Sequence, residues 1–346
     1  PSPVITVKKA VLHNLRNLSL DIPVNRFVCV TGVSGSGKST LVRDVVYANL
    51  RKITGKKRDP HPEFQGCRDL EITGDVKRAI EVDQTPIGRT TRSCPATYIG
   101  IMDRIRKLFS QTPDAMMRGY GPGRFSFNVK GGRCEVCLGQ GLRKVEMNFL
   151  PDVAVTCDAC GGKRFNIETR SVLFKGKSIA DVLQMSVAEA ITFFSAQPSV
   201  RKPLELMRDV GLDYLCLGQQ SPALSGGEAQ RLKLVSELSR ADFTSTTDHT
   251  VYLLDEPTIG LHMADIEKLI LVLHRLVDAG NTVVIIEHNM DIIAESDWII
   301  DLGPDGGERG GKVVVSGPPE TIVRISGKSS TASYLKEFLS GKNRRQ

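Results

Sequence analysis

The chain has 346 residues, of which 40% are hydrophobic and 25% charged, and its formal net charge is +7. This length suits two domains, or one domain with a large insertion. We find no apolar run long enough to span a bilayer and no secretory start, which argues against a membrane or secreted protein and predicts a cytoplasmic location.

A phosphate-binding loop is the first motif along the chain. The apolar run FVCVTG at 27–32 predicts a buried strand, and KSTLVRDVVYANL at 38–50 predicts a helix. Between them, GVSGSGKS at 32–39 fits the pattern G-x-x-x-x-G-K-[ST] at every position. A chance glycine-rich turn is the alternative, but the flanking strand and helix are the context that a P-loop requires.

The P-loop predicts the residues that bind ATP. Its glycines let the backbone N–H groups turn toward the phosphates, Lys38 can reach the β- and γ-phosphates, and the Ser39 hydroxyl can bind Mg²⁺. The predicted ATP-binding residues are Gly32, Gly35, Ser36, Gly37, Lys38, Ser39 and Thr40.

The composition changes after a strand expected at 79–84. Residues 86–149 hold eleven Lys or Arg against four Asp or Glu, an excess of +7 (11 − 4). Clustered positive charge suits a polyanion such as nucleic acid, although a solvated basic face is the plain alternative. The candidates for phosphate contacts to DNA are Arg104, Arg106, Lys107, Arg118, Arg124, Lys130, Arg133, Arg143 and Lys144. Lys130 and Arg133 are the strongest, because they stand immediately before a cysteine pair at a Gly131–Gly132 turn.

Four cysteines predict a structural zinc site. The pairs Cys134/Cys137 and Cys157/Cys160 are both C-x-x-C, and nineteen residues separate them. Residues 143–149 and 152–156 alternate as strands do, so a zinc ion would tie the base of a hairpin that turns at 150–152. Disulfides are one alternative, which a cytoplasmic location disfavours. Free thiols are the other, which the spacing of the two pairs disfavours. The segment 134–141 is also similar to the zinc repeats of J-type chaperones, which come in longer arrays.

Alternation of strands and helices returns after Pro222. Strands are expected at 251–256, 281–288, 297–303 and 312–317, with a helix at 264–280, which together predict a mainly parallel sheet. Asp255 and Glu256 end the first of these strands, where they can hold Mg²⁺ and polarise the attacking water. The turn at 224–228 opens a helix and is a second anion site, which predicts a second nucleotide domain across an interface. The last residues, 341–346, are expected to be disordered.

These motifs resemble those of the ATP-binding-cassette (ABC) ATPases. LSGGE at 224–228 is similar to their signature, VDQTPIG around Gln84 to their Q-loop, TIGLH at 258–262 to their D-loop, and His288 to their switch histidine. The resemblance implies Glu256, His288 and Gln84 as catalytic residues, with Ser39, Gln84 and Asp255 on Mg²⁺. It also implies that Ser225, Gly226, Gly227 and Glu228 contact the ATP of a partnering nucleotide domain.

Within this superfamily the chain resembles the UvrA family, the damage-sensing subunit of bacterial excision repair. RGYGPGRFSFNVKGGRCEVC, CDACGGKRFN and LLDEPTIGLH fit the pattern of its C-terminal half. The resemblance implies ATP, Mg²⁺ and Zn²⁺ as cofactors and damaged double-stranded DNA as ligand. It further implies a second ABC half, a second UvrA copy and, through an N-terminal half, UvrB as partners, without a membrane. The chain begins at Pro1 and shows one set of motifs, so we expect it to be part of a longer protein.

The predicted fold is therefore α/β: an ABC-type P-loop ATPase domain with a large inserted zinc-binding, signature-containing module. The expected boundaries are 1–88 and 221–326 for the two parts of the ATPase core, 89–220 for the inserted module and 327–346 for a C-terminal tail. Three other functions compete with damage recognition: a UvrA-like paralogue for resistance to DNA-binding drugs, the ATPase subunit of a transporter, and an ABC-type translation factor.

Overall fold

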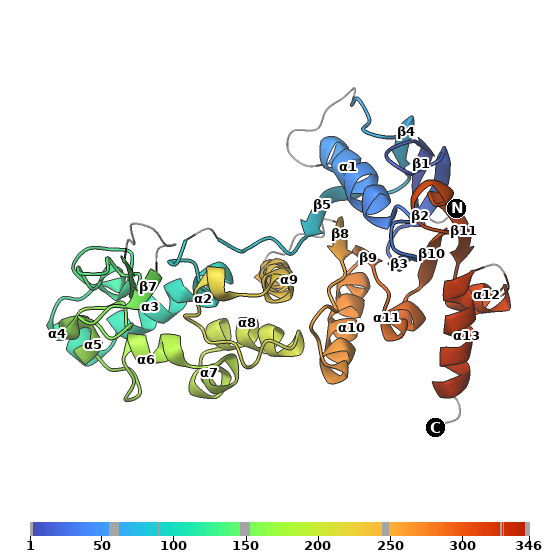
Figure 1. The fold of residues 1–346 in the computed structure, drawn as a ribbon. Helices are drawn as coiled ribbons and strands as arrows, with labels where there is room; N and C mark the ends of the chain where they lie inside the picture. The colour runs from blue at the N-terminus through green and yellow to red at the C-terminus, as the bar shows by residue number, and fades with distance from the viewer. Residues whose placement is uncertain are drawn as a thin grey trace. The chain divides into compact units, whose positions relative to one another are not determined.

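The chain divides into two compact units. The computed structural model describes residues 3–54, 62–88, 90–145, 153–243, 249–325, 327 and 329–342. Unit 1 comprises Pro1–Gln84 and Ser245–Gln346, and unit 2 comprises Thr85–Thr244 (Figure 1). Unit 2 is thus an insertion in unit 1, and the expected α/β fold with a large inserted module is confirmed.

Unit 1 is built on two sheets. Its main sheet has the order β11-β10-β3-β9-β8-β5, in which only β11 runs antiparallel to its neighbour, and a second, antiparallel sheet has the order β2-β1-β4. The strands are β1 (Val4–Ala10), β2 (Leu18–Pro23), β3 (Phe27–Gly32), β4 (Asp69–Ile72), β5 (Val76–Val82), β8 (His249–Asp255), β9 (Thr282–Ile286), β10 (Trp298–Gly303) and β11 (Lys312–Gly317). Every residue of β3 and of β9 is buried, as expected of parallel strands that are covered on both faces.

Helices cover the main sheet. A π-helical segment η1 (Thr40–Tyr47) buries Leu41, Val42, Val45 and Val46 against the core that the two sheets share. The other helical elements are α1 (Ala48–Ile53), α10 (Met263–Asp278), α11 (Met290–Glu295), η4 (Gly307–Arg309), α12 (Pro319–Arg324) and α13 (Ser330–Lys342). Helices α10, α11 and α13 all pack against β3, which leads into the P-loop.

Unit 2 consists mainly of short helices. They are α2 (Pro95–Tyr98), α3 (Met102–Ser110), α4 (Pro113–Met117), η2 (Pro122–Phe125), α5 (Ile167–Ser171), α6 (Ile179–Gln184), α7 (Val187–Phe193), α8 (Pro198–Asp209), η3 (Ser221–Ala223) and α9 (Gly226–Phe243). Strands β6 (Leu142–Val145) and β7 (Val153–Thr156) pair antiparallel, as the sequence predicts, whereas the turn expected at 150–152 lies outside the described residues. Capping boxes begin α6, from Ser178 to Asp181, and α7, from Ser186 to Glu189.

The observed boundaries differ from those expected. The compact insertion begins at Thr85 rather than 89 and ends at Thr244 rather than 220. Helix α9 explains the second difference, because it packs against α2 and α8 and buries Leu232 and Val235. The signature at its start therefore lies in unit 2.

The expected C-terminal tail is an ordered part of unit 1. Helix α13 packs against α11 and α12 and buries Ala332 and Leu335. Of the six residues expected to be disordered, 341 and 342 lie in this helix, and 343–346 lie outside the described residues. Helix α13 carries only a weak signal in the sequence, because its few apolar residues stand in a polar segment.

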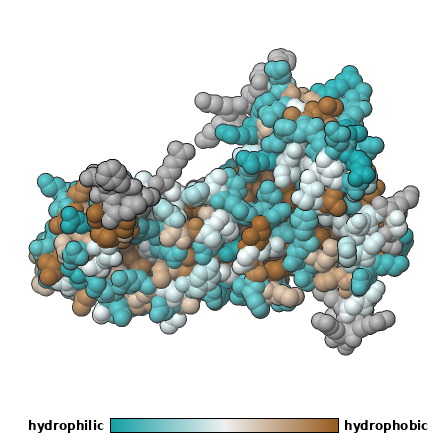
Figure 2. Space-filling view, in the orientation of Figure 1, coloured by the Kyte–Doolittle hydropathy of each residue, from teal (hydrophilic) through white to brown (hydrophobic). Residues whose placement is uncertain are grey.

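Hydrophilic side chains are spread over the visible face of both units, with apolar ones in separate groups (Figure 2). Among the described residues, none of the helices is long and apolar enough to cross a bilayer.

Candidate functional site

The glycines of the P-loop are required by its tight path. Gly32, Gly35 and Gly37 have φ values of +134°, +73° and +102°, a region that strongly favours glycine. A Cβ on Gly32 would lie 2.0 Å from the carbonyl oxygen of Leu302, and one on Gly37 would lie 2.9 Å from Leu15. The loop thus turns against β10 at a distance that only glycine permits.

Three hydrogen bonds from outside the loop hold its shape. The side chain of Asn14 donates from Nδ2 to the carbonyl oxygen of Gly35 at 2.7 Å. The backbone N–H groups of Gly307 and Gly311 donate to the carbonyls of Gly35 and Ser36, both at 3.0 Å. Sequence reasoning missed Asn14, because a lone asparagine before β2 carries no motif.

Lys38 folds over its own loop. Its ammonium donates to the carbonyl oxygens of Gly32 and Val33 at 2.9 and 3.0 Å, and the residue is buried. Burial lowers the pKa of Lys38, and the nearby carboxylates of Glu256 and Asp255 oppose that shift. The next residue, Ser39, is exposed, Thr40 is half-buried, and Ser36 is fully buried. The loop, its lysine and the acidic strand end are therefore electrostatically coupled.

The acidic pair stands at the end of β8. Burial raises the pKa of Asp255, and the charge of Glu256 raises it further. Glu256 has a positive φ of 44°, and its N–H donates to the carbonyl of Ile286 at 2.9 Å. This turn brings its carboxylate to 3.6 Å from Nε2 of His288, which follows β9. The structure thus brings together Glu256 and His288, both of which the resemblance implied as catalytic residues.

Gln84 follows β5, the strand that pairs with β8. Val82 lies opposite Leu254 in this parallel pair, so Gln84 and Asp255 both lie just beyond the carboxyl edge of the sheet. Ligands of open α/β sheets bind at this edge. The side chain of Gln84 is exposed.

A buried carboxylate beside these groups was missed. Glu287 is 2% exposed and lies between Ile286 of β9 and His288. Its Oε1 accepts hydrogen bonds from the backbone N–H and the hydroxyl of Thr258, and its Oε2 accepts from the N–H groups of His288 and Asn289. In the sequence, nothing distinguishes Glu287 except that it stands directly before His288.

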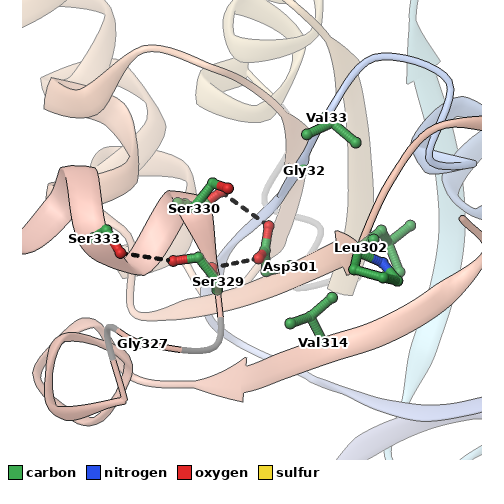
Figure 3. A pocket seen from close by; sticks show the side chains of 12 residues that line it. Gly32, Val33, Asp301, Leu302, Val314, Gly327, Ser329, Ser330 and Ser333 are labelled. Atoms are coloured by element: carbon green, nitrogen blue, oxygen red, sulfur yellow. Dashed lines mark hydrogen bonds between the residues drawn. The ribbon is translucent and has the colours of Figure 1, made fainter.

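A second missed carboxylate lies behind the P-loop. Asp301 of β10 accepts hydrogen bonds from the hydroxyls of Ser329 at 2.6 Å and Thr331 at 2.9 Å, at the start of α13. Thr331 also lies 3.2 Å from the hydroxyl of Thr31, directly before Gly32. Asp301, Ser329 and Thr331 line a cavity of about 300 Å³. Figure 3 shows Asp301 and Ser329 at this cavity, with Gly32 and Val33. Burial raises the pKa of Asp301, while its hydroxyl partners lower it.

The signature begins helix α9 in unit 2. Ser225 and Glu228 form a reciprocal cap, in which Ser225 N–H donates to the Glu228 carboxylate at 2.7 Å and Glu228 N–H donates to the Ser225 hydroxyl at 3.3 Å. The hydroxyl of Tyr214 also donates to Glu228, at 2.7 Å, and burial together with this bond raises the pKa of Tyr214 to about 12. Glu228 therefore orders the helix start that carries Gly226 and Gly227.

The four predicted zinc ligands converge. Cys134, Cys137, Cys157 and Cys160 are buried, and their sulfur atoms all lie within 4.8 Å of one another. The sulfurs of Cys137 and Cys160 are 3.7 Å apart, and the N–H of Gly141 donates to Cys137 at 3.3 Å. A tetrahedral zinc ion with Zn–S bonds of about 2.3 Å places sulfurs roughly 3.8 Å apart. The cluster therefore fits a metal ion of this kind.

The basic candidates differ in their surroundings. Most of the arginines are held by neighbours: Arg104 by Ser199, Arg106 by Asp103, Arg118 by Asp114, Arg124 by Glu168 and Thr169, and Arg133 by Glu135 and Asn128. The exposed candidates are Lys107, Arg118, Lys130, Arg143 and Lys144.

The Gly131–Gly132 turn packs against another loop of unit 2. A Cβ on Gly132 would lie 1.7 Å from the carbonyl oxygen of Arg124. The contact with this loop therefore requires glycine at position 132.

Comparisons with known proteins give close matches over nearly all of the chain. It is 56% identical over 335 residues to the UvrABC system protein A of Aquifex aeolicus, covering 97% of this chain and 35% of that protein. It is 57% identical over 332 residues to the protein of the same name from Thermus thermophilus, covering 96% and 34%. The chain thus spans about a third of the length of the curated relatives it matches. No family model matches it.

A solved structure supports the same relationship. The crystal structure of UvrA2 from Deinococcus radiodurans superimposes with a TM-score of 0.86 at 47% sequence identity, covering 97% of this chain and 40% of that one. The expected ABC-type fold with its cysteine-bearing insertion is confirmed by this match.

Proposed function

Because the chain belongs to the family of UvrABC system protein A, we propose that it is the C-terminal ABC half of an ATP-dependent DNA-damage recognition subunit of nucleotide excision repair. One observation carries the proposal: a four-cysteine hairpin unit is inserted between β5 and β8, neighbouring strands of the sheet that bears the P-loop. A nucleotide site and a metal-tied module thereby share one chain.

The drug-resistance paralogue is the less favoured alternative. The curated relatives at 56 and 57% identity carry the name of the repair-system protein. A transporter subunit and a translation factor are also disfavoured, since the sequence relationship covers the cysteine unit as well as the nucleotide motifs.

ATP hydrolysis is the proposed activity of unit 1. The P-loop N–H groups and Lys38 would bind the phosphates, and Glu256 would take a proton from the attacking water. His288, 3.6 Å from Glu256, would stabilise the negative charge that develops on the γ-phosphate. Gln84 and the exposed Ser39 would approach the nucleotide from the edge of the sheet and from the P-loop. Ser225, Gly226, Gly227 and Glu228 would contact ATP held by a second ABC half.

Two metal ions are proposed. Ser39, Gln84 and Asp255 would hold Mg²⁺, which neutralises phosphate charge when bound. Cys134, Cys137, Cys157 and Cys160 would hold Zn²⁺ in a closed structural site, since four thiolates leave no position open for catalysis. The buried sulfur atoms, all within 4.8 Å of one another, support this assignment.

DNA is the proposed ligand of unit 2. Phosphate contacts would come first from the exposed Lys107, Lys130, Arg143 and Lys144, while the ion-paired arginines would shape the surface. Phosphate contacts position a protein without reading bases, which suits a sensor that responds to distorted DNA of any sequence. The further partners are a second UvrA copy and UvrB, the latter through a part of the protein that this chain does not contain.

One experiment tests the proposal as a whole. The full-length protein is titrated onto a duplex with one bulky adduct, onto the undamaged duplex and onto single-stranded DNA, with ATP, without it, and with the Lys38→Ala variant. Preference for the damaged duplex that depends on ATP and on Lys38 is expected. Equal affinity for the three DNAs with and without ATP would contradict the proposal.

A further inference from the structure

Glu287 is a buried carboxylate with polar partners on both oxygens. It is 2% exposed, and no ion pair with Lys or Arg is found for it among the described residues. A buried charge is strongly destabilising unless hydrogen bonds compensate for the lost water. Four donors converge on Glu287: two on Oε1 and two on Oε2. Such charge-assisted hydrogen bonds are stronger than neutral ones, so this junction is rigid.

The donors come from two different segments. Oε1 binds the backbone N–H of Thr258 at 3.0 Å and its hydroxyl, two residues after Glu256. Oε2 binds the N–H groups of His288 at 2.9 Å and Asn289 at 3.1 Å. One carboxylate therefore ties the loop that carries the proposed base to the loop that carries the proposed switch histidine.

The backbone of Glu287 adds a third connection. Its N–H donates at 3.2 Å to the carbonyl of Val30, in the strand that leads into the P-loop. Glu287 thus contacts three segments: β3, which leads into the P-loop, the segment that follows Glu256, and the segment that carries His288.

We propose that Glu287 is a positioning residue for ATP hydrolysis, which holds Glu256 and His288 at their working separation. The inference rests on the proposed ATPase function and adds to it a residue that touches neither nucleotide nor metal. The geometry makes a specific demand on side-chain chemistry: both oxygens must accept. An amide has only one acceptor oxygen, so in either orientation of Glu287→Gln one pair of donors would face an NH₂ group.

The test separates binding from turnover in the full-length protein. MgATP affinity and kcat are measured for the wild type, Glu287→Gln, Thr258→Val and Thr258→Ser. Glu287→Gln should lower kcat at least about tenfold while the MgATP dissociation constant stays within about threefold, because small displacements of catalytic groups reduce rates without removing the phosphate cradle. Thr258→Val should lower kcat less, and Thr258→Ser, which keeps the hydroxyl, should restore it.

A matched control distinguishes positioning from folding. Thr282 is as buried as Glu287 and lies at the other end of β9, where its hydroxyl accepts a hydrogen bond from Asn25 N–H at 2.8 Å. Thr282→Val should lower thermal stability without changing kcat. The inference would be overturned if Thr282→Val lowered kcat in proportion to its loss of thermal stability. It would also be overturned if Glu287→Gln had the kcat of the wild type. Glu256→Gln in the same assay isolates the proposed function, which fails if that variant hydrolyses ATP normally.

Discussion

His288 Nε2 lies 3.6 Å from Oε1 of Glu256, and the two residues stand on loops that follow neighbouring parallel strands. They are 32 positions apart in sequence (288 − 256), so only the pairing of β8 with β9 brings them together. The arrangement suits Glu256 as a general base, because the imidazole of His288 is a polar neighbour for its carboxyl group after that group has taken a proton from water.

Glu256→Gln should retain MgATP binding and lose at least about a hundredfold in kcat, since general-base catalysis contributes roughly 10²–10⁴. The amide keeps the size of the side chain but accepts no proton. Single-turnover hydrolysis and fluorescent-nucleotide binding measure the two effects. Lys38→Ala is the comparison and should weaken binding itself; equal turnover of Glu256→Gln and wild type would rule Glu256 out as the base.

Cys157→Ser should release the zinc while unit 1 still binds ATP. The fully buried Cys157 belongs to the sulfur cluster of unit 2, whereas the P-loop lies in the sheet of unit 1. Elemental analysis and alkylation of the remaining cysteines report on the site, and nucleotide titration reports on unit 1. Cys29→Ser changes a buried thiol outside the cluster and should leave the zinc content at about one per chain. Wild-type protein without metal would disprove the assignment.

Lys130→Ala should lower the salt slope of log K for DNA by about one unit and leave the zinc content unchanged. The side chain is exposed, so its removal deletes charge and little packing. Arg133→Ala should in addition loosen its loop, because Arg133 pairs with Glu135 at 3.3 Å. Lys202→Ala, an exposed lysine on α8, is the control and should not change the slope. Identical slopes for Lys130→Ala and Lys202→Ala would place the DNA contacts elsewhere.

Gly132→Ala should destabilise unit 2 by about 1–3 kcal/mol, the usual effect of overpacking. The added methyl would lie 1.7 Å from the carbonyl oxygen of Arg124. Gly123→Ala is the matched variant nearby: its Cβ would meet nothing within 4 Å, so the change should stay within about 1 kcal/mol. Urea unfolding of the two variants measures the difference. Similar midpoints would show that the loop adjusts freely around Gly132.

Asp301→Asn should alter how stability depends on pH. Burial raises the pKa of Asp301 above its usual 3.8, so the folded state holds this proton more tightly than the unfolded chain does. The stability that Asp301 contributes to the wild type is therefore fully present at low pH. It declines as the pH rises from 3.8 through the higher pKa that Asp301 has in the folded state. The variant lacks that decline. Urea unfolding from about pH 4 to 7 compares the two, and a pH-independent difference would contradict a raised pKa.

The motifs with strict local chemistry were predictable from sequence. The P-loop needs glycine at positive φ, and the zinc site needs four thiols at set spacing, so each pattern carries its own structure. The structure confirms the convergence of Cys134 with Cys157 and the buried strand before Gly32. The identification of ABC motifs rested on resemblance, and the relatives confirm the family.

The supporting groups could not be predicted, because their roles depend on distant partners. Asn14, Glu287 and Asp301 act through hydrogen bonds to residues of other segments, and no periodicity marks such contacts. The short helices of unit 2 were missed for a similar reason. Segments of five to seven residues, such as α5 and α7, show too few turns for an apolar stripe, and their ends depend on caps.

The strand order also dictates when the sheet that bears the P-loop can form during synthesis. Strand β3, which leads into the P-loop, is made early, yet its two neighbours, β9 and β10, follow unit 2 in the chain. A ribosome therefore completes all of unit 2, including its four cysteines, before the sheet can close around Val28 and Cys29. The four-cysteine module can fold while this sheet is still incomplete, so nascent chains pass through a stage at which unit 2 is formed and the P-loop is not yet held between its neighbouring strands.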